Sequence, residues 1–162
     1  MNFGDPFGLT DYNQQQTIEQ FLQQAYSDAT AGYFKGLRNI FHHSSGGADF
    51  DFAHNEHAGD TFTVCGIKMS AGDFGNFMAG FQSGAWDDAF YGDVDMGFSL
   101  KHLWQLRYAE TVARMFGAGY HLKGDTDVPN DRLDKGGMPW ITLGADYGRS
   151  FSQRGGGCGC LK

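Results

Sequence analysis

The sequence is poor in proline, cysteine and glutamate, and it contains no long apolar run. Its 162 residues include 3 prolines, 3 cysteines and 12 basic residues against 19 acidic ones, which gives a net charge of -7. No stretch approaches the ~18 apolar residues of a membrane span, and the first residues lack the basic start and apolar segment of a signal peptide. The sequence therefore predicts no transmembrane segment. A net negative charge opposes binding along the phosphate backbone of a nucleic acid, so we expect no stable nucleic-acid binding.

The few cysteines do not indicate a disulfide framework. Cys65 lies in an apolar run and is typical of a small core residue. Cys158 and Cys160 are one residue apart, which is too constrained for an easy disulfide. They fall in a Gly-rich stretch, and we predict that residues 154–162 form a flexible tail. A metal or redox role for these two thiols is the alternative.

Glycine, aspartate and aromatic residues are abundant. The chain has 25 glycines, and aromatic residues make up 15% of it. All but three of the acidic residues (Glu19, Glu56 and Glu110) are Asp, which favours turns and helix caps over helix interiors. We therefore expect most carboxylates in loops. A hydrophobic content of 41% in a chain of this length fits one packed domain.

The spacing of apolar residues predicts a mainly helical domain. Apolar stripes at helical periodicity predict helices, and one run of β-branched and aromatic residues predicts a strand. The expected fold class is α+β, mainly α, a single compact domain of four to five helices with a small amount of strand. The predicted helices cover residues 12–31, 33–41, 73–85 and 99–116 and a last stretch that begins at Pro139, and the predicted strand covers residues 61–69.

Three local features carry further expectations. The strand at 61–69 should be buried on both faces, and residues 87–97 and 124–137 should form acidic loops. Gly80 and Gly84 lie four residues apart, so they should form a seam on the 73–85 helix where another backbone approaches closely.

The start of the chain carries the most specific motif. Residues 5–9 read Asp-Pro-Phe-Gly-Leu, which resembles the Asp-Pro-x-Gly-Leu signature that closes the core of RHS-repeat proteins just before their variable C-terminal toxin. The resemblance implies that an RHS core shell cleaves itself after Leu9. Residues 1–9 are then a remnant of the shell, and residues 10–153 are the released toxin domain.

Three later segments resemble the bacterial polymorphic toxin type 44 family. They are a Gly-Gly stretch leading to Asp51, a Gly-Asn-aromatic stretch, and an Asp-rich loop before the last helix, at residues 46–52, 73–80 and 125–131. The resemblance implies a secreted effector that is delivered into a target cell and neutralised by a cognate immunity protein.

The candidate catalytic residues include aspartates near the second and third of these segments. Asn76, with Gly75, is expected at a helix start, where free backbone N–H groups attract anions. Asp73 is either the helix cap or a catalytic carboxylate that folding brings beside Asp51 or Asp131, and Asp127 is a further candidate. Paired carboxylates suit general acid and base work in hydrolysis, although Asp-rich loops are often only solvated turns.

Residues 54–57, His-Asn-Glu-His, are the densest titratable cluster. His54 or His57 could act as a general base, the cluster could bind zinc, or it could be an ordinary surface loop. The segment lacks the helical His-Glu-x-x-His spacing, and the loop from Asp125 fails the calcium-binding pattern at its fifth, sixth and twelfth positions. No nucleotide or dinucleotide motif is present. The sequence therefore predicts no cofactor and assigns no metal site.

Taken with the resemblances, these residues predict an antibacterial effector toxin that is a hydrolase using Asp and His side chains. An acidic, aromatic-rich and Gly-rich surface favours a neutral glycan or peptide of the cell envelope, such as peptidoglycan or its precursor, which would be reached from the periplasm. An RNase or DNase acting in the cytoplasm is the main alternative. A non-enzymatic membrane-disrupting domain is the third.

Overall fold

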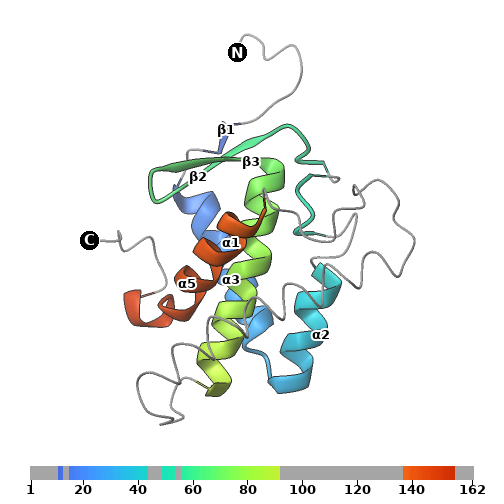
Figure 1. The fold of residues 1–162 in the computed structure, drawn as a ribbon, viewed down its shortest axis with the longest axis vertical. Helices are drawn as coiled ribbons and strands as arrows, with labels where there is room; N and C mark the ends of the chain where they lie inside the picture. The colour runs from blue at the N-terminus through green and yellow to red at the C-terminus, as the bar shows by residue number, and fades with distance from the viewer. Residues whose placement is uncertain (1–10, 13–14, 44–48, 54–55, 92–136, 156–162) are drawn as a thin grey trace.

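The computed structural model describes residues 11–12, 15–43, 49–53, 56–91 and 137–155 (Figure 1). The Asp-Pro-Phe-Gly-Leu motif, the predicted helix at 99–116, nearly all of the 124–137 loop and the two C-terminal cysteines lie outside the described residues. So do three of the candidate catalytic residues: His54, Asp127 and Asp131.

Two helices near the N-terminus form a helical hairpin. Helix α1 (Gln15–Ala29) buries one side at helical periodicity, and Gly32, at φ 135°, allows the turn into α2 (Tyr33–His43). α2 continues through His43, so the prediction that it ends before His42 is wrong. His43 pairs with acidic side chains of α1 and of the following loop, and these contacts extend the last helical turn. The buried side of α1 consists of Ile18, Leu22, Ala25 and Ala29.

The predicted strand at 61–69 is a hairpin of two strands, β2 (Thr61–Val64) and β3 (Ile67–Ser70). Cys65 and Gly66 lie between them at φ 50° and 83°, and positive φ at both central residues is typical of the two-residue hairpin turn. The glycine in the apolar run was the signal for this turn. The prediction of burial on both faces is also wrong, because Phe62, Val64 and Met69 are buried while Lys68 is exposed. A short strand β1 (Asp11–Tyr12) pairs in parallel with β2, which gives the order β1-β2-β3.

The central helix α3 (Ala71–Tyr91) begins directly after the hairpin. Ser70 is its N-cap, since the Ser70 hydroxyl accepts a bond from the Asp73 backbone N–H at 3.2 Å and donates to the Asp73 carboxylate at 2.7 Å. Residues 87–91 are helical, so the prediction of a loop beginning at residue 87 is wrong there. Asp87 is buried on this last part of α3 because it pairs with Arg149 of another helix.

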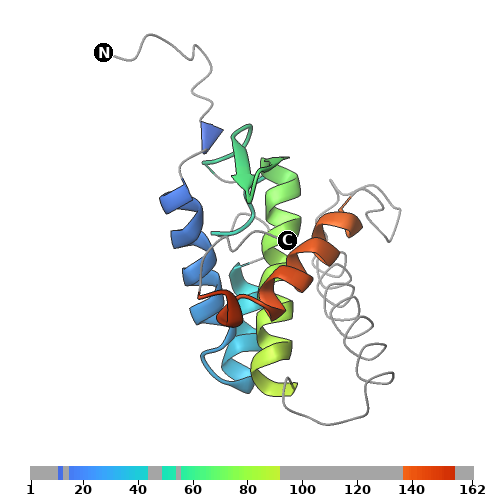
Figure 2. The same cartoon turned by 90° about the vertical axis from the view of Figure 1, so that its left-hand side faces the viewer.

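Helices α3 and α5 (Met138–Arg149) cross with their backbones almost in contact (Figures 1 and 2). A Cβ added at Gly80 would overlap the Ile141 carbonyl oxygen, and one added at Gly84 would overlap the Ala145 carbonyl oxygen. The predicted glycine seam is therefore confirmed. The close approach is reciprocal, because Gly144 and Gly148 of α5 lie against carbonyl oxygens of α3.

Aromatic side chains fill the core between these elements. Tyr147 of α5 is buried in this core, and beyond α5 the chain turns through the buried Phe151 into a short 3-10 helix, η1 (Ser152–Arg154). Trp86 anchors a smaller cluster between α2 and α3, and its ring nitrogen donates to the Tyr33 carbonyl at 2.9 Å.

The sheet lies at one end of the helices (Figure 2). The domain is compact and mainly helical with a small sheet, as the sequence predicts. None of the described helices is long and apolar enough to cross a membrane.

Candidate functional site

The loop between α2 and the hairpin places one predicted histidine against an aromatic wall. The His57 ring lies 5.5 Å from the ring of Phe52, 6.0 Å from that of Phe21 and 6.2 Å from that of Phe62, measured between centroids. Phe52 and Phe62 are fully buried. The wall therefore restricts the orientation of the imidazole, which is itself only 17% exposed.

His57 is paired with a buried carboxylate. Its Nδ1 lies 3.1 Å from Oδ2 of Asp60, whose side chain is 7% exposed. An ionised carboxylate only accepts hydrogen bonds, so Nδ1 is the donor in this pair. Nε2 is 3.8 Å from Oε1 of Glu56, a side chain that is 88% exposed.

Asp60 is a candidate site residue that sequence reasoning missed. The loop closes on itself because the Asp60 N–H donates to the His57 carbonyl at 2.9 Å, and Gly59 between them adopts φ 93°. This tight turn aligns the two side chains three residues apart. The available signal was the His-x-Gly-Asp order, in which glycine permits the turn.

The segment that carries Asp51 packs on the first turns of α3. A Cβ at Gly75 would lie 3.3 Å from the Phe50 carbonyl oxygen and 3.7 Å from the Phe52 nitrogen. Asp51 lies between these two phenylalanines, so the structure brings its backbone close to the part of α3 that contains Asp73 and Asn76. Asp51 itself is partly buried.

Asn76 does not have the position that the sequence predicts, whereas Asp73 takes the helix-capping position, one of the two roles predicted for it. Asn76 lies in the second turn of a helix that begins at Ala71, so the prediction that it stands at the helix start is wrong. The free N–H groups of a helix belong to its first turn. Asp73 is in that turn, and its carboxylate accepts the bond from Ser70 that completes the cap. A helix-capping role therefore accounts for Asp73.

A second histidine, His43, also contacts carboxylates, and sequence reasoning did not single it out. Its Nδ1 lies 3.1 Å from Oδ2 of Asp49, and its Nε2 lies 3.7 Å from Oδ2 of Asp28. The His43 ring contacts Phe50 at 5.5 Å, and Phe50 in turn stacks on Phe52. The two histidine pairs thus flank one aromatic loop.

The described residues contain no group of three or more His, Cys, Asp or Glu side chains that could hold a metal ion. Within this part of the chain, the candidate site is a set of histidine–carboxylate pairs.

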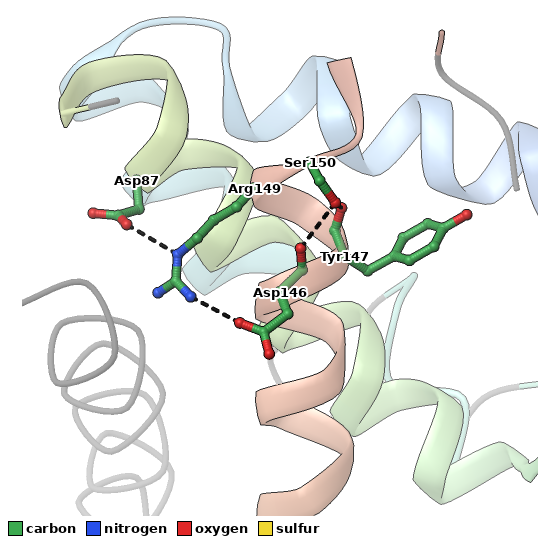
Figure 3. Close-up of polar contacts among 5 residues, drawn as sticks. All are labelled: Asp87, Asp146, Tyr147, Arg149 and Ser150. Atoms are coloured by element: carbon green, nitrogen blue, oxygen red, sulfur yellow. Dashed lines mark hydrogen bonds and ion pairs between the residues drawn. The ribbon is translucent and has the colours of Figure 1, made fainter. Parts of the chain in front are cut away.

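A separate polar cluster joins α3 to α5 (Figure 3). The Arg149 guanidinium contacts Asp87 through Nε at 3.2 Å and Asp146 through Nη1 at 3.1 Å. The Asp87 and Arg149 side chains are only 4% and 15% exposed. Arg149 thus connects a buried carboxylate of α3 to an exposed one of its own helix, and this connection fixes the ends of the two helices relative to each other.

Comparison of the chain with protein-family models, with curated proteins and with solved structures gives no match. The resemblances to RHS-repeat proteins and to the type 44 family stay predictions from their motifs.

Proposed function

We propose that the chain is a secreted antibacterial effector toxin and that its domain is a hydrolase in which His57 is the general acid and base. One observation carries the catalytic part of the proposal. His57 is a partly exposed imidazole whose Nδ1 is held by a buried carboxylate and whose ring is held by an aromatic wall. This is how histidine bases are oriented in hydrolases that use a histidine–aspartate pair.

The chemistry follows from the orientation of the ring. Nε2 of His57 takes a proton from an attacking water, and the resulting imidazolium is stabilised by Asp60 through the bond at Nδ1. The same proton then passes from Nε2 to the leaving group, which restores the neutral imidazole. Asp60 acts as a positioning residue for the imidazole.

The charge around the histidines favours a substrate that is not a polyanion. Glu56, beside His57, is 88% exposed, and Asp49, beside His43, is 80% exposed. Both carboxylates would repel a phosphate backbone, in line with the net charge of -7. A glycan or peptide of the cell envelope, such as peptidoglycan or its precursor, meets less repulsion.

The motifs at residues 5–9, 46–52, 73–80 and 125–131 support the biological context of this proposal. By their resemblance, the domain leaves an RHS core shell after Leu9 and is neutralised by a cognate immunity protein. An envelope substrate would place its action in the periplasm of the target cell.

Toxicity assays with and without an export signal test the proposed target. The full chain is expressed inducibly in a sensitive bacterium, either in the cytoplasm or fused to a periplasmic signal. We expect killing only after export. Killing only from the cytoplasm, with loss of RNA or DNA, would show a nuclease, and leakage of purified vesicles without any hydrolysis would show a membrane-disrupting domain.

Variants of the histidine pair test the catalytic assignment. We expect His57→Gln and Asp60→Asn each to reduce killing by about 100-fold or more, since general acid–base catalysis contributes on this scale. Asp146→Asn is the matched control, because it makes the same chemical change on an exposed carboxylate of α5 and should leave killing unchanged. Circular dichroism must show that the variants stay folded. A folded His57→Gln variant that kills like the parent chain would refute the assignment.

A further inference from the structure

Helix α2 exposes one aromatic and two basic side chains on its outer face. Phe34 is 82% exposed, and no other large apolar side chain of the described residues is classed as exposed. Lys35 and Arg38 are also exposed, and neither pairs with an acidic side chain of the described residues. α2 contains no acidic residue, in a chain whose net charge is -7. We call Phe34, Lys35 and Arg38 the α2 stripe.

The opposite face of α2 is buried in the domain, which keeps the α2 stripe on the solvent side of the helix. Gly36 and Ile40 are buried, and a Cβ at Gly36 would overlap the Ala29 carbonyl oxygen, so α2 cannot rotate about its axis. Phe34 and Arg38 lie one turn apart on the same side of the helix, and Lys35 lies beside Arg38. In Figure 1, α3 lies between α2 and α5.

We propose that the α2 stripe is a docking site for an anionic lipid surface. Two cations beside a protruding aromatic ring are complementary to negatively charged head groups above an apolar layer, into which the ring inserts. Two acidic side chains, Asp28 and Asp49, pair with His43 in the last turn of α2. His43 is five residues from Arg38 and eight residues from Lys35, or roughly 8 Å and 12 Å along the helix axis.

Two other anionic partners fit the stripe less well. A nucleic acid binds through many phosphate contacts, whereas the stripe offers two cations. A stable protein interface involves about 20–30 residues on each side, whereas the stripe is one face of an 11-residue helix. A bilayer needs only a few basic side chains and one inserted apolar group, which is what α2 presents.

The biological use of this contact rests on the proposed function, because docking on a membrane would hold an envelope hydrolase beside lipid-linked substrates. The contact itself does not depend on catalysis. His57→Gln must therefore leave lipid binding unchanged, and failure of either proposal can be recognised separately.

Sedimentation with lipid vesicles tests the docking site. The full chain is mixed with vesicles of phosphatidylcholine alone or of equal parts phosphatidylcholine and phosphatidylglycerol. We expect binding to the anionic vesicles only. We expect Phe34→Ser to weaken that binding about tenfold and Lys35→Gln with Arg38→Gln to weaken it about 30-fold. Binding should also weaken sharply near 1 M salt, where the Debye length falls to about 3 Å.

Lys68→Gln is the control, since it removes one exposed cation from β3, outside the stripe. It should change binding much less than the double substitution in α2. Equal binding to neutral and anionic vesicles, or stripe variants that bind like the parent chain, would overturn the proposal. Absence of binding to either vesicle would also overturn it and would leave an acidic protein as the partner to seek. Unchanged circular dichroism spectra would show that the substitutions act on the surface alone.

Discussion

Replacement of Gly80 by alanine should destabilise the domain through the crossing of α3 and α5. Gly80 is buried, and a Cβ at this position would overlap the carbonyl oxygen, the carbonyl carbon and the Cα of Ile141. These are backbone atoms, so no side-chain rotation can relieve the overlap, and α5 must move away from α3. The movement would also disturb the reciprocal contacts of Gly144 and Gly148.

Two opposing effects set the size of the loss. Overpacking typically costs about 1–3 kcal/mol, and we take the upper end because the overlap is with backbone. Alanine gains up to about 1 kcal/mol over glycine in helix propensity. The net expectation is a loss of about 2 kcal/mol, which corresponds to a fall in Tm of about 4–8 °C for a chain of this size.

Gly72→Ala is the matched control for this prediction. Gly72 lies on the same helix, and its added Cβ would meet only the Cβ of Ala53 at 3.9 Å, an ordinary contact. It should leave the free energy of unfolding unchanged or raise it by up to about 1 kcal/mol. Thermal and urea unfolding followed by circular dichroism measure both variants. If Gly80→Ala is as stable as Gly72→Ala, the two helices do not cross as closely as the structure shows.

Three further substitutions probe single contacts, each by urea unfolding. Gly66→Ala should lower the free energy of unfolding by about 1 kcal/mol, because the turn needs φ 83°, which alanine adopts only with strain. The added Cβ meets no atom within 4 Å, so the loss comes from the backbone conformation and not from a clash. Gly66→Asn should lose less stability, and an equal loss for both variants would contradict this explanation. Ser70→Ala removes the cap of α3 and should also cost about 1 kcal/mol, whereas no change would mean that the hydroxyl does not stabilise the helix start. Arg149→Met leaves the buried Asp87 carboxylate without the guanidinium and should cost about 3 kcal/mol. Part of that loss should return when Asp87→Leu is added, and a double variant less stable than Arg149→Met would refute the pairing.

The local pattern of the sequence accounts for most of the helices. Apolar residues at helical spacing define the buried sides of α1, α3 and α5, and this spacing is visible without any knowledge of neighbours. Gly80 and Gly84 likewise indicated a close backbone approach, because a residue without a side chain, repeated after one turn, exposes the helix backbone. Their partner was not visible, since it lies about sixty residues further along the chain.

The errors occurred where a distant residue or one backbone dihedral decides the structure. Residues 61–69 have strand composition throughout, and only the left-handed conformations of Cys65 and Gly66 divide them into two strands. The acidic residues at 87 and 88 favoured a loop, yet α3 continues because Arg149 compensates the Asp87 charge.

The candidate site shows the same division. The sequence by itself determined that His57 stands in a titratable loop and that an Asp-rich chain offers many carboxylates, because residue type alone sets which groups can exchange protons. Only the tertiary structure decided which carboxylate serves His57, placed Asn76 away from the helix start, and paired His43 with Asp28 and Asp49. The physical reason is that hydrogen-bond partners are selected by distances of about 3 Å, and such distances depend on how helices and loops pack.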